Sequence, residues 1–455
     1  MSNGRTSVSG TSTGRRPRRW WPAVVICAAA GLLSTACAGS ASTGSASTGS
    51  ASTGTGGSGS ARPSASATAA GAQLTITPAN GSRDARPDQG VSVTAARGKI
   101  TSVTVTPAGD PATGQASEPV SGTLGPAGAS WHSTWALSVS QRYTVTAQAV
   151  TPSGQHVTQT SSFRTLTPTR TFQTMIFEGL GKTYGVGMPI MLTFSEPVVD
   201  KQAVERSLQL RTSKPVVGAW YWDGSQTLDF RPRGYWPANT TVSFTGHLNG
   251  VQAAPGLYGA HTLTQSFNIG ASTIVVASTA THFMRVYRNG KLFSRWPIST
   301  GKPGDNTPNG TYLTIEKGNP VLMKGPGYKL EVPWSVRFTW SGDYLHDAFW
   351  SVGERGFTNV SHGCVNMPPA DAKIYYKMAI PGDPVTVTGR PRPGVWDNGW
   401  TEWFLPWSKY VKGSALHEAV EAGPAGSSFV SPATLAATAP TAPLHAPRQD
   451  NWAAS

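Results

Sequence analysis

The sequence has few charged residues and few cysteines. Only 13% of its 455 residues are Asp, Glu, Lys or Arg, and three are cysteine. Helical bundles and coiled coils need charged residues on their exposed faces, so this composition excludes both classes. Three cysteines are also too few for a disulfide framework. Cys27 and Cys37 lie within the first 38 residues, which leaves Cys364 as the single thiol of the remaining chain.

Acidic residues are scarcer than basic ones. Asp and Glu number 23 against 37 Lys and Arg, which gives a formal net charge of +14. Five of the basic residues precede residue 20, so the chain beyond them keeps +9 of this charge. The excess favours an acidic partner such as a polyanionic cell envelope. We expect no nucleic-acid partner, because no basic run is interleaved with aromatic residues.

The sequence lacks an apolar run as long as a membrane span near its start. Residues 20–33 are almost entirely apolar, but a span needs about 20 such residues. A basic stretch precedes them and small residues follow, which is the layout of a secretory signal. We therefore predict a signal peptide or lipoprotein signal over 1–38, with a retained anchor as the alternative.

Two processing routes fit the end of this segment. Residues 33–37 resemble a lipobox, in which Cys37 would be acylated, whereas the small residues Ala36 and Ala38 fit cleavage after Ala38 by ordinary signal peptidase. Both routes export the protein, so we expect it in the cell envelope, at the outer face of the cytoplasmic membrane or in the wall. Membrane contact would be made only through a lipid or an N-terminal anchor.

Glycine and proline are abundant, and low-complexity segments flank the central part of the chain. Residues 39–72 are almost entirely Ser, Ala, Thr and Gly, and 414–455 are rich in Ala, Pro and Ser. Both are predicted to be disordered, the first as a linker and the second as a tail. Between them, 73–168 and 169–271 contain short alternating segments bounded by turn residues. This pattern predicts an immunoglobulin-like β-sandwich in each block.

Residues 272–389 form a third block, again predicted to be mostly strand. It contains one predicted helix, over 368–378, which begins with proline and has helical spacing of apolar residues. A Trp-rich piece, 390–413, follows and is expected to pack on this block. The predicted fold class is mostly β, with two immunoglobulin-like sandwiches and a β-rich domain that has one short helix near Cys364.

The most informative motif is Ser-His-Gly-Cys-Val-Asn at 361–366. A thiol is a strong nucleophile only as a thiolate, which needs a nearby imidazolium, a helix N-terminus or donated hydrogen bonds. Cys364 precedes the predicted helix by four residues, and the N–H groups of Gly363 and Cys364 are candidates for an oxyanion hole. His346 lies 18 residues upstream and is the candidate base. The alternative is that Cys364 only fills the core.

No metal or other cofactor is expected. One Cys with scattered His residues, His282, His346 and His362, lacks the paired spacing of metal ligands. No His-Glu-x-x-His segment occurs either. The candidate chemistry is therefore that of the side chains alone.

The motif 361–366, with His346 before it, resembles the signature of the L,D-transpeptidase catalytic domain (YkuD-like). Residues 299–310 and 356–360 extend this resemblance, which covers about 273–389. The signal, linker, paired sandwiches and Trp-rich piece together resemble the two-sandwich L,D-transpeptidases of actinobacteria. Residues 272–389 are thus identified as an L,D-transpeptidase catalytic domain.

The resemblance implies acyl transfer on peptidoglycan stem peptides. Cys364 would attack the carbonyl of the third residue of a donor tetrapeptide, release D-alanine and form a thioester. An amine of a neighbouring stem would then attack, giving a 3→3 cross-link with meso-diaminopimelate on both sides. His346 would act as general base and then as general acid. Glycine or a protein amine stays open as the acceptor.

The resemblance also assigns roles around the nucleophile. The N–H groups of Gly363 and Cys364, with Tyr328, would stabilise the oxyanion. Residues 320–328 would form a short lid over the donor site. In the related proteins a Ser commonly follows the catalytic His and orients it through its backbone carbonyl, but here the residue is Asp347. Either its backbone orients the ring, or its carboxylate favours the imidazolium.

Five residues are candidates for contacts with the loop or the substrate. His362 and Asn366 would orient both, or serve as structural hydrogen-bonding residues. Ser361 and Asp347 are further candidate substrate-binding residues. Arg355 is a candidate partner for a substrate carboxylate, and its alternative is a solvated loop residue.

Two other functions stay open. A wall L,D-carboxypeptidase or Cys/His amidase would use water in place of the amine, although such amidases usually place the Cys before the His. A non-catalytic wall-binding protein would use its sandwiches as adhesive modules, and an intact His346 and Cys364 argue against this. A transpeptidase of this kind would also be acylated at Cys364 by carbapenems.

Overall fold

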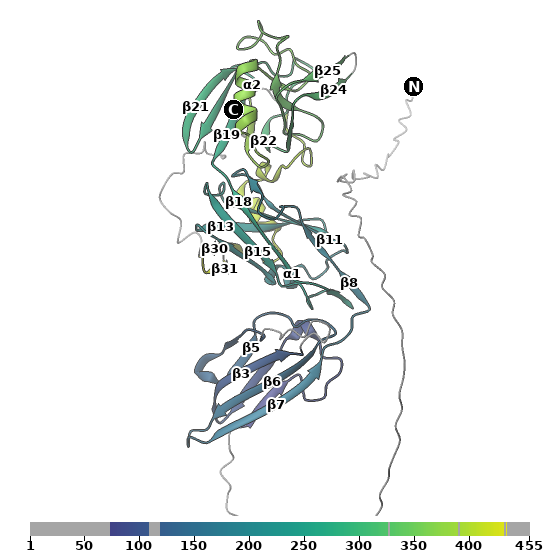
Figure 1. The fold of residues 1–455 in the computed structure, drawn as a ribbon, viewed down its shortest axis with the longest axis vertical. Helices are drawn as coiled ribbons and strands as arrows, with labels where there is room; N and C mark the ends of the chain where they lie inside the picture. The colour runs from purple at the N-terminus through teal and green to yellow at the C-terminus, as the bar shows by residue number, and fades with distance from the viewer. Residues whose placement is uncertain (1–72, 109–118, 326–327, 390–391, 432–433, 435–455) are drawn as a thin grey trace, which may run out of the picture. The chain divides into compact units, whose positions relative to one another are not determined.

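The computed structural model describes residues 73–108, 119–325, 328–389, 392–431 and 434 (Figure 1). The predicted signal with Cys37, the predicted linker and the final part of the predicted tail lie outside these residues. Among the described residues, no helix combines the length and the hydropathy that a membrane span requires.

The first block forms two antiparallel sheets that enclose one apolar core. One sheet has the strand order β1-β2-β5-β4 and the other β3-β6-β7. Alternate residues point inward, so Val93, Val105, Trp131, Val145 and Phe163 are buried together. The strands are β1 (Gln73–Thr77), β2 (Ser92–Ala96), β3 (Lys99–Pro107), β4 (Gly122–Leu124), β5 (Ser130–Ser133), β6 (Arg142–Val150) and β7 (His156–Arg164).

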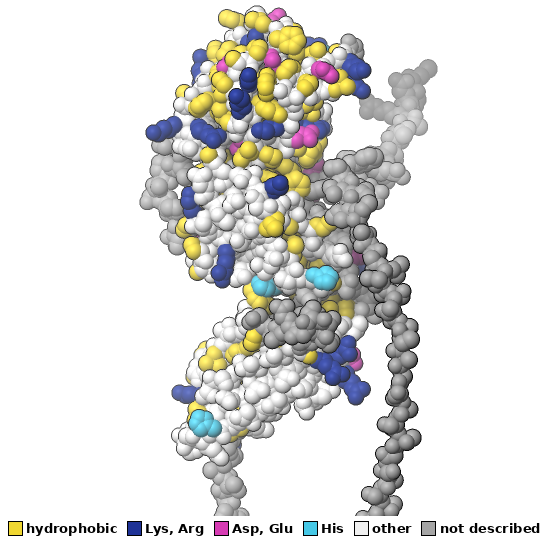
Figure 2. Space-filling view, in the orientation of Figure 1, with side chains coloured by type: hydrophobic (Ala, Val, Ile, Leu, Met, Phe, Trp, Pro, Cys, Tyr) yellow, Lys and Arg dark blue, Asp and Glu magenta, His cyan; other side chains and the backbone are white. Residues whose placement is uncertain are grey.

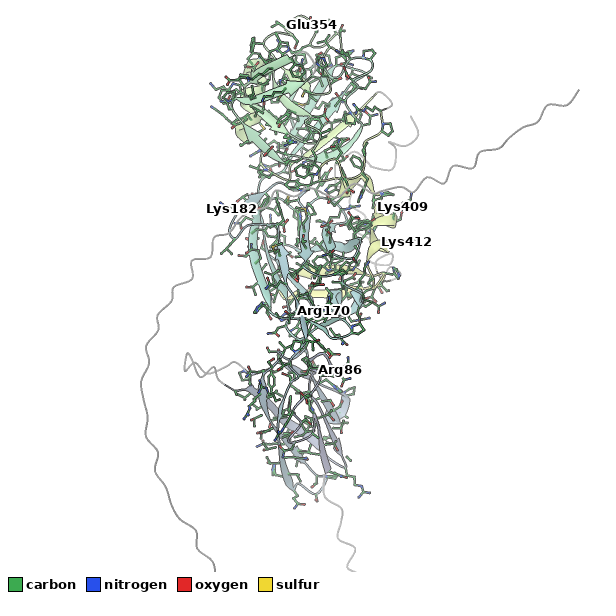
Figure 3. The ribbon with its side chains drawn as sticks, turned by 90° about the vertical axis from the view of Figure 1, so that its right-hand side faces the viewer. Arg86, Arg170, Lys182, Glu354, Lys409 and Lys412 are labelled. Atoms are coloured by element: carbon green, nitrogen blue, oxygen red, sulfur yellow. The ribbon has the colours of Figure 1, made fainter. Side chains whose placement is uncertain are left out.

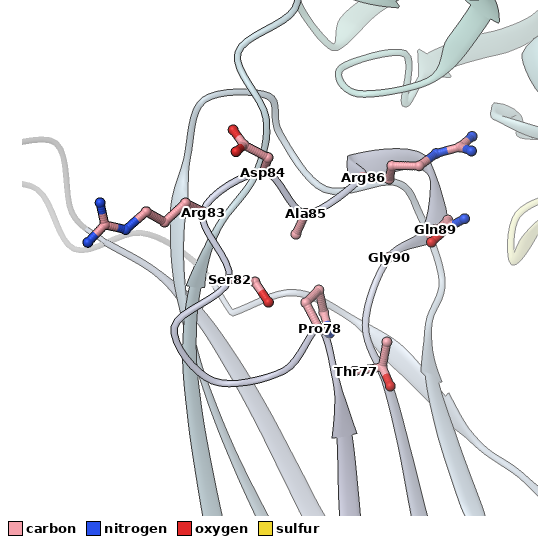
Figure 4. Close-up of a pocket in the computed structure, with 9 residues that line it drawn as sticks. All are labelled: Thr77, Pro78, Ser82, Arg83, Asp84, Ala85, Arg86, Gln89 and Gly90. Carbon is pink, nitrogen blue, oxygen red and sulfur yellow. The ribbon is translucent and has the colours of Figure 1, made fainter.

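A hollow of about 350 Å³ lies in this sandwich, where the chain leaves β1 (Figure 4). Its lining includes the charged residues Arg83, Asp84 and Arg86, but no Cys, His or Glu. Arg86 forms a salt bridge with Asp88. The hollow therefore contains neither of the predicted reacting residues, Cys364 and His346, which belong to the third block.

The second block is a larger sandwich around an aromatic core that includes Trp220, Phe230, Phe244 and Phe267. Its sheets have the orders β10-β18-β15-β12 and β31-β30-β13-β14-β11-β9, with a small sheet β16-β17-β8. The elements are β8 (Arg170–Phe172), β9 (Thr174–Ile176), β10 (Thr183–Tyr184), β11 (Ile190–Phe194), α1 (Lys201–Arg206), β12 (Leu208–Thr212), β13 (Val216–Asp223), β14 (Thr227–Pro232), β15 (Thr240–Gly246), β16 (Gln252–Ala254), β17 (Leu257–Gly259) and β18 (Leu263–Ile269).

Two strands of this sheet come from the C-terminal part of the chain. β30 (Ala419–Gly423) pairs with β13, and β31 (Gly426–Val430) pairs with β30. The prediction of disorder from residue 414 is therefore wrong up to residue 430. The buried carboxylate of Glu205 also accepts hydrogen bonds from Ser414 Oγ and Ala415 N. The segment is ordered because it pairs with β13 and is anchored by Glu205, although its Ala- and Ser-rich composition suggested disorder.

The Trp-rich piece contacts two cores rather than one. Phe404 packs against Tyr312 of the third block, with ring centroids 5.0 Å apart, as expected. Trp400 and Trp403, however, belong to the core of the second sandwich. The indole N–H of Trp403 donates to the carbonyl of Gly187 at 2.8 Å. The piece contains the short elements η3 (Glu402–Phe404), α3 (Trp407–Tyr410) and η4 (Val411–Gly413).

The third block has a five-stranded sheet, β21-β20-β19-β29-β22, a four-stranded sheet, β23-β26-β27-β28, and a hairpin, β24-β25. Its strands are β19 (Thr273–Ser278), β20 (Phe283–Arg288), β21 (Lys291–Pro297), β22 (Gly310–Leu313), β23 (Glu316–Gly318), β24 (Val321–Gly325), β25 (Tyr328–Val332), β26 (Ser335–Arg337), β27 (Tyr344–Asp347), β28 (Val365–Met367) and β29 (Pro384–Thr388).

The predicted helix of this block is confirmed as α2 (Pro369–Met378). It follows β28 directly, and its residues Ala372 and Tyr375 are buried in the same core as Val365 and Met367. The helix thus anchors the strand that follows Cys364. Strands predominate throughout the described residues, so the predicted mostly-β fold class is confirmed as well.

Candidate active site

The predicted nucleophile and base lie on neighbouring parallel strands. β27 pairs with β28 so that His346 is opposite Asn366, and Cys364 directly precedes β28. Extending this register by one residue places Cys364 opposite Tyr344, two positions from His346. Paired residues share a face and side chains alternate along a strand, so the thiol and the imidazole face the same side of the sheet. The Cys364 Sγ lies 3.8 Å from the carbonyl oxygen of Gly342, just before β27.

His346 is held as a neutral base. Its Nδ1 lies 2.7 Å from the backbone carbonyl of Asp347. A carbonyl oxygen only accepts hydrogen bonds, so Nδ1 carries the ring proton and Nε2 is left to accept one. The ring stacks on Trp350 and is 3% exposed. This burial lowers the pKa of His346 to about 4, because water no longer solvates the imidazolium.

The surroundings of the half-buried Cys364 also favour a neutral thiol. Burial is the main cause that raises its pKa to about 12, and the negative charge of Asp343 adds to the effect. A neutral thiol fits the predicted role of His346 as a general base, which removes the proton as Sγ attacks its substrate.

This neutral pair predicts how Cys364 reacts with iodoacetamide at different pH values. The reagent alkylates the thiolate, so a thiol with a pKa of about 12 should react about tenfold faster per pH unit, without a plateau between about pH 6 and pH 9. The full-length chain is alkylated at each pH, and mass spectrometry of the Cys364 peptide measures this slope. A plateau near neutral pH would instead show a preformed thiolate–imidazolium pair.

The loop before the nucleophile is closed by its own hydrogen bonds. Ser361 Oγ donates to the carbonyl of Cys364 at 2.6 Å, and the N–H of Gly363 donates to Ser361 Oγ at 3.1 Å. The carbonyl of Gly363 accepts a bond from Thr307 Oγ1. The prediction that the Gly363 N–H serves an oxyanion hole conflicts with its bond to Ser361. That role then rests on the Cys364 N–H and Tyr328, and both stay predictions. Ser361 is buried and holds the loop.

Tyr328, at the start of β25, lies over this loop. Its ring stacks on the exposed ring of His362, with centroids 5.3 Å apart. Burial raises the pKa of Tyr328, and the charges of Cys364, Asp305 and Asp343 raise it further. The predicted lid, 320–328, thus overlaps the hairpin β24-β25, of which residues 326–327 are outside the described part.

The side chains of Asn366 and Arg355 both donate hydrogen bonds to other groups of the protein. Asn366 Nδ2 donates to Ser351 Oγ at 3.1 Å, which supports its structural role rather than contact with substrate. Arg355 is 7% exposed and donates to the carbonyls of Ala348 and Met367. The alternative that Arg355 is a solvated loop residue is therefore wrong, because its guanidinium is buried and bridges β28 and the segment after β27. These bonds argue against the prediction that it binds a substrate carboxylate, which stays untested.

Asp347 orients His346 through its backbone, as the bond to Nδ1 shows. Its carboxylate is buried, which raises its pKa, and the opposing charge nearby is that of Arg355 rather than that of the imidazole. The hypothesis that this carboxylate favours the imidazolium is thus not supported, and burial also argues against the prediction that Asp347 binds substrate.

Two charged residues of the site were missed by sequence reasoning. Lys302 Nζ lies 3.0 Å from His362 Nε2 and 3.5 Å from Asp305 Oδ2. Asp343 lies beside Gly363 and raises the pKa of the thiol. Lys302 occurs in the segment 299–310 that carried the family resemblance, and Asp343 lies three residues before His346, so these positions were the available signal. Among the described residues, no three His, Cys, Asp or Glu side chains form a candidate metal site.

Comparisons with known proteins agree with this site. Residues 272–387 match the L,D-transpeptidase catalytic domain, and residues 82–252 match a bacterial Ig domain. The chain is 32% identical over 356 residues to L,D-transpeptidase 2 of Mycobacterium tuberculosis, covering 75% of this chain and 85% of that protein. The chain belongs to the L,D-transpeptidase family. It is therefore an acyltransferase with a bacterial Ig region and a catalytic domain.

Other L,D-transpeptidases show the same similarity. L,D-transpeptidase 5 of M. tuberculosis is 32% identical over 76% of this chain and 77% of its own length. The solved structure of LdtMt1 in complex with imipenem is 36% identical, with a TM-score of 0.41, and covers 49% of this chain and all of that chain. An L,D-transpeptidase from Mycobacterium smegmatis is 35% identical with a TM-score of 0.39, over 47% of this chain and 97% of its own.

Proposed function

We propose that this L,D-transpeptidase forms 3→3 cross-links between peptidoglycan stem peptides. In the first half-reaction, Cys364 Sγ attacks the carbonyl carbon of the third residue of a donor tetrapeptide while His346 Nε2 takes the thiol proton. The tetrahedral oxyanion collapses, the C–N bond breaks, and His346 returns the proton to the amine of the leaving D-alanine. A thioester on Cys364 and a neutral His346 remain.

In the second half-reaction, the amine of a neighbouring stem loses a proton to His346 and attacks the thioester carbonyl. The C–S bond breaks, and Cys364 Sγ recovers a proton from His346, so the enzyme returns to its starting state. The observation that supports this cycle best is the neutral His346, fixed by its bond to the Asp347 carbonyl on the strand beside Cys364. A neutral base can serve both half-reactions without a change of tautomer.

Two related proposals depend on the same thiol and on the N-terminal segment. A carbapenem would acylate Cys364 through its β-lactam carbonyl, because the strained amide replaces the donor carbonyl in the first half-reaction. Export by the predicted signal would place the enzyme in the cell envelope, where stem peptides occur. An adduct on Cys364 in the mass spectrum tests the first of these proposals.

Product analysis tests the proposed function. The full-length chain is incubated with a disaccharide tetrapeptide, beside a Cys364→Ala variant. We expect a dimer whose mass shows the loss of one D-alanine, and its absence with the variant. Tripeptide without dimer would instead indicate a carboxypeptidase, and unchanged substrate would indicate a binding protein without catalysis.

A further inference from the structure

A carboxylate lies next to the nucleophile and is fixed in place. Asp343 directly precedes β27, and its Oδ2 accepts hydrogen bonds from Thr339 Oγ1 at 2.7 Å and Ser341 Oγ at 3.1 Å. Its own N–H donates to Thr339 Oγ1 at 2.8 Å. Two bonds to the carboxylate and one from the backbone of the same residue therefore set the direction of this side chain before any substrate binds.

The other carboxylate oxygen faces the residue before Cys364. A Cβ added to Gly363, which has φ +131°, would overlap Asp343 Oδ1. The carboxylate thus fills the space that a side chain at position 363 would need. Its charge raises the pKa of both Cys364 and Tyr328, in agreement with this placement.

Asp343 has no cationic partner among the described side chains. Its carboxylate forms none of the salt bridges found there, and the nearby Lys302 is paired with Asp305. The face of the catalytic domain drawn in Figure 2 carries both basic and acidic side chains. A half-buried, unpaired carboxylate at this position is unfavourable for a thiolate and for an oxyanion, because like charges repel at short distance. A cationic ligand would remove this cost.

We propose that Asp343 binds the ammonium group of the acceptor and so selects a cationic amine for the second half-reaction. This inference rests on the proposed function, whose acceptor it defines as a primary amine that is protonated at neutral pH. The carboxylate raises the local concentration of that amine beside the thioester. The ammonium releases one proton to solvent, and neutral His346 takes the second as the amine attacks, then passes it to Cys364 Sγ when the C–S bond breaks. Water gains nothing from this attraction, so Asp343 favours cross-linking over hydrolysis. An acceptor with a carboxylate at the same place is repelled.

The partition of the acyl-enzyme between amine and water tests this role. Asp343→Asn removes the charge but keeps an amide oxygen that accepts from Thr339 and Ser341, so the turn is preserved. With the disaccharide tetrapeptide, we expect the ratio of dimer to tripeptide to fall about tenfold, the effect of one partly screened charge. D-alanine release in the first turnover should not fall, because the removed charge is unfavourable for the oxyanion. The matched control is Glu354→Gln, which removes one negative charge elsewhere on the catalytic domain (Figure 3).

A second measurement does not depend on transpeptidation. Cys364 in the full-length chain is modified with a cationic methanethiosulfonate (trimethylammonioethyl) or an anionic one (sulfonatoethyl). The ratio of the cationic rate to the anionic rate should fall about tenfold or more in Asp343→Asn and stay unchanged in Glu354→Gln. An unchanged rate ratio in Asp343→Asn would overturn the inference even if the wild type formed no dimers. Wild-type dimers with an unchanged product ratio in the variant would overturn it while leaving the proposed function intact.

Discussion

Replacing His346 by glutamine is expected to lower the rate of acyl-enzyme formation about 10³-fold, within the range of a lost general base. Glutamine fills much of the same space and can still donate to the Asp347 carbonyl, but it cannot take the thiol proton. Since the pKa of Cys364 is raised to about 12, almost no thiolate is present at pH 7 to replace the base. The measurement is release of D-alanine in a single turnover.

A control variant and a pH profile distinguish the loss of the base from a general loss of structure. An exposed histidine of the second sandwich, His261, offers a matched His→Gln control that should leave the rate unchanged. The rate of His346→Gln should also rise with pH as hydroxide forms the thiolate, whereas the wild-type rate should stay nearly flat above pH 6, well above the His346 pKa of about 4. A loss of less than about tenfold would show that another group acts as the base.

Replacing Gly363 by alanine is expected to lower the same rate about 10²-fold, because a displacement of the nucleophile by about 1 Å has this effect. The new Cβ would overlap Asp343 Oδ1, and the φ of +131° is in a region that side chains rarely adopt. The loop must therefore move, and Cys364 moves with it. Single-turnover release of D-alanine measures the loss.

Gly353→Ala is the matched control for this substitution. Gly353 lies in the same domain, and a Cβ added there meets nothing within 4 Å. Its activity should equal that of the wild type. If Gly363→Ala were fully active, the close packing of Asp343 against the loop would not exist in solution, and the inference on Asp343 would lose its geometric support.

The sequence predicted that Cys364 and His346 lie close together, because both stand in short segments close to each other in the chain. Cys364 stands inside a conspicuous hexapeptide, and the strand pairing of His346 with Asn366 follows from the short separation of the two segments. The turn residues that bound short alternating segments also predicted two sandwiches. These features depend on residue type and short-range pattern, which a single sequence contains in full.

The parts that could not be predicted depend on contacts between distant segments. The order of β30 comes from its pairing with β13, some two hundred residues away, and its Ala-rich composition gives no sign of this partner. The bond from Gly363 N–H to Ser361 and the burial of Arg355 depend on the exact path of the loop. The contact of Asp343 with Gly363 depends on the path of the turn before β27, which no local sequence pattern specifies.

The most direct test of the proposed mechanism is the mass of the acyl-enzyme. The full-length chain is mixed with donor tetrapeptide, quenched in acid within the first turnover and digested. We predict an adduct on the Cys364 peptide equal to the donor minus D-alanine, removable by hydroxylamine as a thioester should be, and absent in Cys364→Ala. Release of D-alanine without this adduct, or an adduct on another residue, would contradict the mechanism.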